Sequence, residues 1–333
     1  MRASQLEQVL SAVIIPTKRP AMIWGPPGVG KSQIVAQCGA KAGIEVIDWR
    51  LVLMDSVDLR GIPCVKQDLT HWNPPAELPS KGKGILFLDE LPQAATATSN
   101  AATQLILDRK LGNYRLPDGW LVIAAGNREE DRAATNRMPS HVANRFIHLS
   151  FDVHTGDWLE WAQGAGNLDP RVFAFIKYRP EFLHRFDAKS KEKSFASPRA
   201  WAFMSEVLQE ADRAAMGWVA EERVELAAGV VGKEAAVEFV GFLRIMEKLI
   251  DLDSILLDPA KAKLPDDPAV VYALVYALLD RSDRKGFAKV ATYINRLSKE
   301  FQFLFYREVK VRKGELQKSK EFIDWAAKNH DFA

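Results

Sequence analysis

Short apolar runs alternate with helical patterns along the first half of the chain. Such runs, when bounded by glycine, proline or acidic residues, are typical of buried β-strands. The chain has five of them, at residues 21–24, 45–53, 85–88, 120–125 and 146–151. Apolar positions recur at helical spacing before and between these runs, at residues 3–14, 32–42 and 96–107. Strands that alternate with helices predict an α/β fold with a parallel sheet and right-handed crossovers.

The second half of the chain carries no strand pattern after about residue 155. Its apolar residues recur at helical spacing, which predicts helices over residues 157–162, 170–178, 198–211, 220–228, 233–248, 268–279, 286–305 and 319–328. Three prolines between residues 258 and 268 indicate a break within this helical region. We therefore predict three parts: an α/β core over residues 1–154, a small α-helical domain over 155–250 and a helical C-terminal extension over 251–333.

Composition narrows the class of protein. The chain has 333 residues, a length typical of about two domains. Its 45 basic and 43 acidic residues give a net charge of +2, which argues against a protein whose main work is neutralising a nucleic-acid backbone. Two cysteines, Cys38 and Cys64, favour a reducing compartment. No signal-peptide pattern appears, and the longest apolar run is roughly half of a bilayer span. We expect a soluble, cytoplasmic protein without a membrane segment.

A glycine-rich loop follows the first predicted strand. Residues 25–32 read GPPGVGKS and fit the phosphate-loop pattern G-x-x-x-x-G-K-[ST], with a strand before and a helix after, which disfavours an ordinary Gly/Pro turn. In such loops backbone N–H groups surround phosphate oxygens, the lysine reaches the β- and γ-phosphates and the hydroxyl binds Mg²⁺. The pattern predicts ATP and Mg²⁺ as cofactors, with Ser32 as a metal ligand. The predicted nucleotide contacts are Gly25, Pro26, Pro27, Gly28, Val29, Gly30, Lys31, Ser32 and Gln33.

Polar side chains follow two later strands. Asp89 and Glu90 end the apolar run ILFL, and Asn127 ends the run LVIAAG. Ligands of open α/β sheets bind at this carboxyl edge of the strands. We predict that Asp89 holds Mg²⁺ through water and that Glu90 orients and deprotonates the water that attacks the γ-phosphate. Asn127 is a candidate to bind the γ-phosphate or that water; taken alone, it would be read as a residue that starts a turn.

With these three elements in order, the chain resembles the AAA+ ATPases, and specifically their MoxR-like branch. Residues 55–61 (DSVDLRG) resemble the branch's D-L-x-G stretch, residues 139–146 (PSHVANRF) its P-E-A-x-x-D-R-F stretch and residues 197–200 its S-P-R-A. The resemblance covers about residues 10–245. It implies a P-loop NTPase (AAA+) core with a parallel sheet, followed by an all-α lid and a helical extension.

The resemblance also implies roles for three polar residues. Asn127 would be sensor 1, Arg199 would be sensor 2 in the lid, and Arg145 would be the arginine finger that reaches the nucleotide of a neighbouring subunit. An arginine finger contributes about 10³–10⁵-fold to the rate because its guanidinium neutralises charge in the transition state. A finger that acts between chains implies a ring of identical subunits, with a hexamer expected.

The stretch around the finger departs from the family pattern. Asn144 stands where the branch has aspartate, and Ser140-His141 stands where it has Glu-Ala. The preceding loop, residues 128–137, is also unusually charged and contains Arg132 and Arg137. The identity of the arginine finger therefore stays open among Arg145, Arg137 and Arg132.

Two segments match insertions that face the central pore in this branch. Residues 63–79 match the helix-2 insert, and residues 108–117 match the hairpin before sensor 1, where Gly112-Asn113 suits a hairpin turn. The candidates for gripping a partner are Trp72, Lys110, Tyr114 and Arg115. Alternatively, Trp72 packs the loop that contains Pro74-Pro75.

The chain is thus predicted to be a Mg²⁺-dependent ATPase that hydrolyses ATP at the subunit interfaces of a ring and remodels a protein partner. The resemblance implies chaperone-type activity, with a von Willebrand factor A-domain protein as the expected partner. One alternative is a nucleic-acid motor or loader of phage or mobile-element type, which the near-neutral charge disfavours. Another is an assembly scaffold that binds ATP with little turnover, which the presence of Glu90 and Arg145 disfavours.

Overall fold

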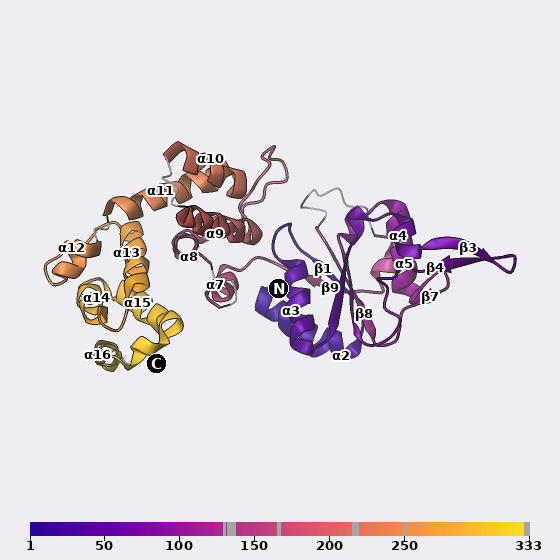
Figure 1. Cartoon of the computed structure of the whole chain (residues 1–333), viewed down its shortest axis with the longest axis horizontal. Helices are drawn as coiled ribbons and strands as arrows, with labels where there is room; N and C mark the ends of the chain where they lie inside the picture. Colours follow the sequence, from indigo (N-terminus) through magenta and orange to yellow (C-terminus); the bar gives the residue numbers. More distant parts are fainter. Residues whose placement is uncertain (129–130, 132–137, 165–167, 215–219, 250–251, 330–333) are drawn as a thin grey trace. The chain divides into compact units, whose positions relative to one another are not determined.

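The computed structural model describes residues 1–128, 131, 138–164, 168–214, 220–249 and 252–329 (Figure 1). The chain forms two compact units. The first contains residues 1–157 and 186–191, and the second contains residues 158–185 and 192–333. The predicted division of the helical half at residue 250 stays a prediction.

The first unit is built on a five-stranded parallel sheet with the order β2-β5-β8-β1-β9. The strands are β1 (Ala21–Trp24), β2 (Glu45–Arg50), β5 (Gly84–Asp89), β8 (Trp120–Gly126) and β9 (Ile147–Ser150). All five predicted strands are present, which confirms the α/β fold. The second strand is shorter than predicted because residues Leu51–Leu53 form a 3-10 turn, η2, that buries Leu51 in the core.

Helices cover both faces of this sheet. They are α1 (Ala3–Val9), the π-helical turn η1 (Leu10–Ile14), α2 (Ile15–Thr17), α3 (Lys31–Ala42), α4 (Ser56–Arg60), α5 (Thr96–Asp108) and α6 (Ser140–Ala143). Successive side chains of a strand point to opposite faces. In β5, Ile85 and Phe87 pack with α1, η1 and α3, whereas Leu86 and Leu88 pack with α5. Figure 1 shows α3 and α5 on opposite sides of the strands.

Two small hairpins complete the first unit. One joins β3 (Ile62–Lys66) to β4 (Leu69–Asn73), and the other joins β6 (Lys110–Leu111) to β7 (Tyr114–Arg115). The register of the second hairpin places Gly112-Asn113 at its turn, as predicted. The first hairpin was not predicted. Figure 1 shows it extending away from the sheet.

The described part of the second unit is helical. Its elements are α7 (Thr155–Gln163, which begins in the first unit), α8 (Pro170–Tyr178), η5 (Pro180–Phe182), α9 (Pro198–Arg213), α10 (Ala220–Val231), α11 (Lys233–Leu249), α12 (Leu252–Leu257), α13 (Pro268–Arg281), α14 (Phe287–Ile294), α15 (Lys299–Arg312), η6 (Gly314–Lys318) and α16 (Lys320–Lys328). Its core is rich in aromatic side chains. The centroid of the Phe175 ring lies 5.3 Å from that of Trp201 and 5.2 Å from that of Phe239. None of the helices in the described ranges combines the length and apolar character needed to cross a bilayer.

The prediction of one helix over residues 286–305 is wrong. The chain leaves α14 at Asn295 and enters α15 after Ser298, two residue types that favour helix ends over helix interiors. The amide of Gln302 donates to the carbonyls of Asn295 (3.1 Å) and Leu297 (2.8 Å). These bonds satisfy backbone groups that the end of a helix leaves without a partner, so the break is stable.

Candidate nucleotide-binding site

The loop between β1 and α3 has a backbone that only glycine accommodates easily. Gly28 and Gly30 have φ angles of +77° and +95°, in the left-handed region that other residues rarely adopt. A Cβ atom on Gly25 would lie 2.7 Å from the carbonyl oxygen of Phe151, so a side chain there would push the loop off the end of β9. The predicted phosphate loop therefore curls tightly above the edge of the sheet and leads directly into α3.

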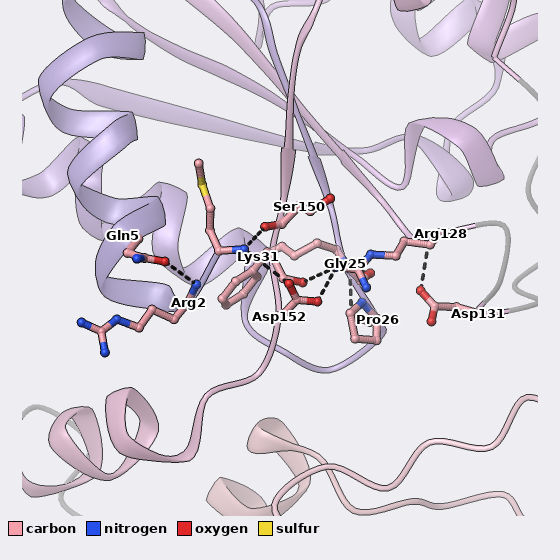
Figure 2. A network of polar contacts seen from close by, with 11 residues as sticks. Arg2, Gln5, Gly25, Pro26, Lys31, Arg128, Asp131, Ser150 and Asp152 are labelled. Atoms are coloured by element: carbon pink, nitrogen blue, oxygen red, sulfur yellow. Dashed lines mark hydrogen bonds and ion pairs between the residues drawn. The ribbon is translucent and has the colours of Figure 1, made fainter.

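Lys31, the first residue of α3, connects the loop to the end of β8. Its Nζ donates to the carbonyl oxygens of Gly25 (2.8 Å) and Pro26 (3.0 Å), as Figure 2 shows. It also donates to Oδ1 of Asn127 (2.9 Å). The side chain is largely buried. The structure thus brings the predicted phosphate-binding lysine and the predicted sensor amide into direct contact.

The two predicted metal ligands also meet. Oγ of Ser32 donates to Oδ2 of Asp89 at 2.8 Å, although the two residues belong to α3 and β5. Asp89 is buried at the carboxyl end of its strand. A hydroxyl and a carboxylate are hard oxygen ligands that suit Mg²⁺, which commonly takes its other ligands from water and substrate phosphates. The described residues contain no group of three acidic, histidine or cysteine side chains that could hold a metal alone. These two residues therefore fit Mg²⁺ bound together with a nucleotide.

Asp48 is a further carboxylate near Asp89, and sequence analysis did not single it out. It lies in β2 in register with Phe87 of β5. Burial and the neighbouring charge of Asp89 raise the pKa of Asp48 above its ordinary value. A cation beside Asp89 would favour the charged form of Asp48. The only sequence signal was an acidic residue inside an apolar run.

Glu90 has an unusual backbone conformation. Its φ is +58° and its ψ is +32°, in the left-handed region, and the residue leads into the 3-10 turn η3 (Leu91–Gln93). A non-glycine residue held there costs about 1–3 kcal/mol, and such strain clusters at functional sites. Its N–H donates to Oδ1 of Asp89 at 3.0 Å. The chain therefore turns sharply off β5 directly after the metal-ligand candidate.

Arg128 crosses over the start of the phosphate loop, and sequence analysis gave it no role. Its Nη2 donates to the carbonyl of Phe151 (3.1 Å) and to Oδ1 of Asp152 (2.6 Å). This guanidinium holds the pKa of Asp152 below its usual range. Because β1 lies between β8 and β9, a side chain that joins the ends of those strands passes over the end of β1 (Figure 2).

The remaining predicted arginines lie in different parts of the chain. Arg145 follows α6 in the first unit, and its side chain is exposed. Arg199 is an exposed residue in the first turn of α9 in the second unit, where Oγ of Ser197 caps the helix by accepting from the N–H of Ala200. Arg132 and Arg137 lie outside the described residues. The roles of all four stay predictions.

The two hairpins contact each other. The side chain of Trp72 lies against Gly112, where an added Cβ would be 3.2 Å from it, and Asn113 pairs with His71 at 3.2 Å. The hydroxyl of Tyr114 donates to the carbonyl of Pro79 at 2.7 Å. Trp72 and Tyr114 are thus half-buried and packed within the first unit, and their role in gripping a partner stays a prediction. The exposed side chains of the hairpins include those of Ile62, Val65, Leu69, Lys110 and Arg115.

Comparison with known proteins agrees with this geometry. Residues 21–147 match the family described as "ATPase family associated with various cellular activities (AAA)". No curated protein matches the chain. A point mutant of RuvB from Thermotoga maritima is 14% identical, with 76% of this chain and 78% of that chain covered and a TM-score of 0.44. NtrX from Brucella abortus in complex with ADP is 16% identical, with 92% and 67% covered and a TM-score of 0.42.

The family match and the observed topology define a fold class. Residues 21–147 are similar to an AAA-type ATPase domain. The chain's parallel sheet, phosphate loop and helical second half form a P-loop fold of the AAA+ class. The family match supports nucleotide binding at this site.

Proposed function

We propose that this protein is a Mg²⁺-dependent ATPase of the MoxR-like type, which hydrolyses ATP between the subunits of a ring to remodel a protein partner. The observation that carries the proposal is the meeting of four predicted residues at one edge of the sheet. Lys31 contacts Asn127, and Ser32 contacts Asp89, with Glu90 directly after it. This convergence lies within the segment that matches the AAA family.

In this proposal the loop and Lys31 bind the triphosphate. The N–H groups of the loop and the N-terminus of α3 attract negative charge. Lys31 would exchange its bonds to the carbonyls of Gly25 and Pro26 for bonds to phosphate oxygens. Ser32 and Asp89 would hold Mg²⁺, which when bound neutralises charge that develops on the phosphates.

The same proposal assigns the chemical step to Glu90 and Asn127. The carboxylate of Glu90 would accept a proton from the attacking water, and Asn127 would orient that water or the γ-phosphate. Left-handed backbone at Glu90 turns the chain away from the strand, which supports a residue placed to serve a ligand rather than the core.

Exposed side chains support the proposal of a ring and of a protein partner. Arg145 is exposed and thus accessible to a neighbouring subunit, and the hairpin residues Ile62, Val65 and Leu69 offer apolar contacts to a protein segment. A von Willebrand factor A-domain protein is the partner that the MoxR-like assignment favours. Stimulation of the ATPase by DNA, with a steep salt dependence, would instead indicate a nucleic-acid motor.

Replacing Lys31 with alanine should weaken ATP binding. Hydrogen bonds to charged groups contribute about 1.5–3 kcal/mol, which corresponds to roughly a 10- to 150-fold rise in Kd. Fluorescence titration with a labelled ATP analogue and Mg²⁺ measures this change. Lys41→Ala is the matched control, because Lys41 is an exposed lysine near the other end of α3. An unchanged Kd in Lys31→Ala would overturn the nucleotide site.

Mixing two variants of impaired activity tests whether Arg145 is the arginine finger. Arg145→Ala subunits retain the phosphate loop, and Lys31→Ala subunits retain the finger, so mixed rings contain interfaces with both groups intact. Random mixing in equal amounts should restore about a quarter of the wild-type turnover if the finger acts between subunits. Turnover is measured by phosphate release, and ring formation by mass photometry. If mixed rings form and recover no activity, Arg145 is not the finger.

A further inference from the structure

Gln93 contacts two residues of the proposed site through its side chain. It is the last residue of η3, the turn that follows Glu90. With its amide oxygen toward Asn127, it accepts from the backbone N–H at 2.9 Å and from Nδ2 at 3.1 Å. In the same orientation its amide nitrogen donates to the carbonyl of Glu90 at 3.3 Å. This is the orientation in which the donors and acceptors of all three residues match.

The contact with Asn127 determines how that amide faces. Asn127 uses Oδ1 to accept from Lys31 at 2.9 Å and Nδ2 to donate to Gln93. An amide group offers an acceptor at one end and donors at the other, so these two partners select one orientation. Without Gln93 the amide would lose the partner that keeps Nδ2 away from the phosphate loop.

The contact with Glu90 concerns its strained backbone. The carbonyl of Glu90 receives the N–H of Gln93 at 3.0 Å in addition to the side-chain amide. Strained conformations persist only where the surrounding contacts over-determine them. Gln93 thus supplies two of the bonds that hold Glu90 at a φ of +58°.

The turn itself is held by different residues. Leu91 and Pro92 are buried, and Gly126 is so close that an added Cβ would lie 2.5 Å from Pro92. The half-buried side chain of Gln93 adds polar contacts to Asn127 and Glu90. Removing that side chain should therefore leave the packing of η3 intact while freeing the two site residues.

We propose that Gln93 is a positioning residue that links the phosphate-binding pair Lys31 and Asn127 to Glu90. This inference rests on the proposed ATPase function. Gln93 would keep the Asn127 amide and the Glu90 backbone in the orientation that hydrolysis requires, without touching the nucleotide. Binding of a nucleotide at the phosphate loop would affect the position of Glu90 through the hydrogen bonds that join Lys31 to Asn127, Asn127 to Gln93 and Gln93 to Glu90.

The test compares Gln93→Met, which keeps the length of the side chain but no hydrogen-bonding group, with Gln93→Glu, which keeps the acceptor for Asn127. We expect Gln93→Met to lower kcat about 10- to 100-fold, because a small misplacement of reacting groups has effects of this order. The Kd for ADP and the Tm should stay unchanged, and Gln93→Glu should recover part of the rate. Gln37→Met, at an exposed position of α3, is the control.

Hydrogen exchange gives a readout that does not depend on turnover. The N–H of Asn127 loses its acceptor in Gln93→Met, so its exchange should become faster in the unliganded protein. A wild-type kcat in Gln93→Met would overturn the positioning role while leaving the ATPase in place. A lower kcat accompanied by a weaker affinity for ADP and a lower Tm would do the same, because it would indicate general damage to the fold. A wild-type protein without ATP turnover would overturn the proposed function and this inference together.

Discussion

Replacing Glu90 with glutamine is expected to lower ATP turnover by about 10²–10⁴-fold, the usual contribution of a general base. Glutamine has nearly the same shape but cannot accept the proton of the attacking water. Nucleotide affinity should change little, because Lys31, Ser32 and Asp89 remain in place. Single-turnover hydrolysis measures the chemical step, and titration with labelled ATP measures binding in the same variant.

The matched control for this variant is Glu45→Gln. Glu45 is exposed at the amino end of β2, whereas Glu90 follows the carboxyl end of the neighbouring strand β5. The control should keep full turnover. Wild-type turnover in Glu90→Gln would remove Glu90 as the base and leave Asn127, Asp89 and the metal to activate the water.

The central strands β1, β5 and β8 could be predicted from sequence because they are buried on both faces. Strands of this kind read as continuous apolar runs, and Ile85–Leu88 of β5 is an example in which every residue is buried. The helices that follow them begin at recognisable positions, such as Lys31 after Gly30. Local composition and the overall fold agree in these segments, so local reasoning was sufficient.

The β3–β4 hairpin could not be found in the same way. Its residues Ile62, Val65 and Leu69 are exposed, so no alternation of buried and exposed positions appears in the sequence. Pro63 also weakens the sequence pattern of β3, since proline is depleted in strands. The hairpin depends instead on a distant contact, between Trp72 and Gly112 of the second hairpin.

The residues of the candidate site also differ in whether the sequence alone could predict them. Lys31, Ser32, Asp89 and Asn127 stand in motifs whose spacing has a chemical reason, and the structure places them within hydrogen-bond distance in pairs. Gln93 and Arg128 have no such motif. Their contacts are with residues that follow other strands, namely Asn127 after β8 and Asp152 after β9, and only the folded chain brings these partners together.

Replacing Glu308 with alanine should have the largest effect on stability. Glu308 lies in α15 with its side chain fully buried. Its carboxylate accepts from Lys177 of α8 at 2.8 Å and from Gln163 of α7 at 2.8 Å, and it pairs with Arg312 at 3.3 Å. Removing one partner of a buried ion pair destabilises a protein by about 3–5 kcal/mol, because the other charge remains buried without compensation.

Urea denaturation followed by tryptophan fluorescence measures this loss in the free energy of unfolding. Glu315→Ala is the control, since Glu315 is exposed in the same unit and such surface changes stay within about 0.5 kcal/mol. A loss of similar size in both variants would show that Glu308 is not the required countercharge of Lys177 and Arg312.

The dependence on pH separates a lost charge pair from lost packing. Burial already lowers the pKa of Lys177, and the carboxylate of Glu308 opposes that effect. Without Glu308 the pKa of Lys177 in the folded state should fall further below its value of about 10.4 in the unfolded chain. Between these two values the unfolded state binds more protons, so the stability of Glu308→Ala rises with pH. The deficit relative to wild type should therefore shrink in alkaline solution, whereas a cavity left by a lost side chain would give a deficit independent of pH.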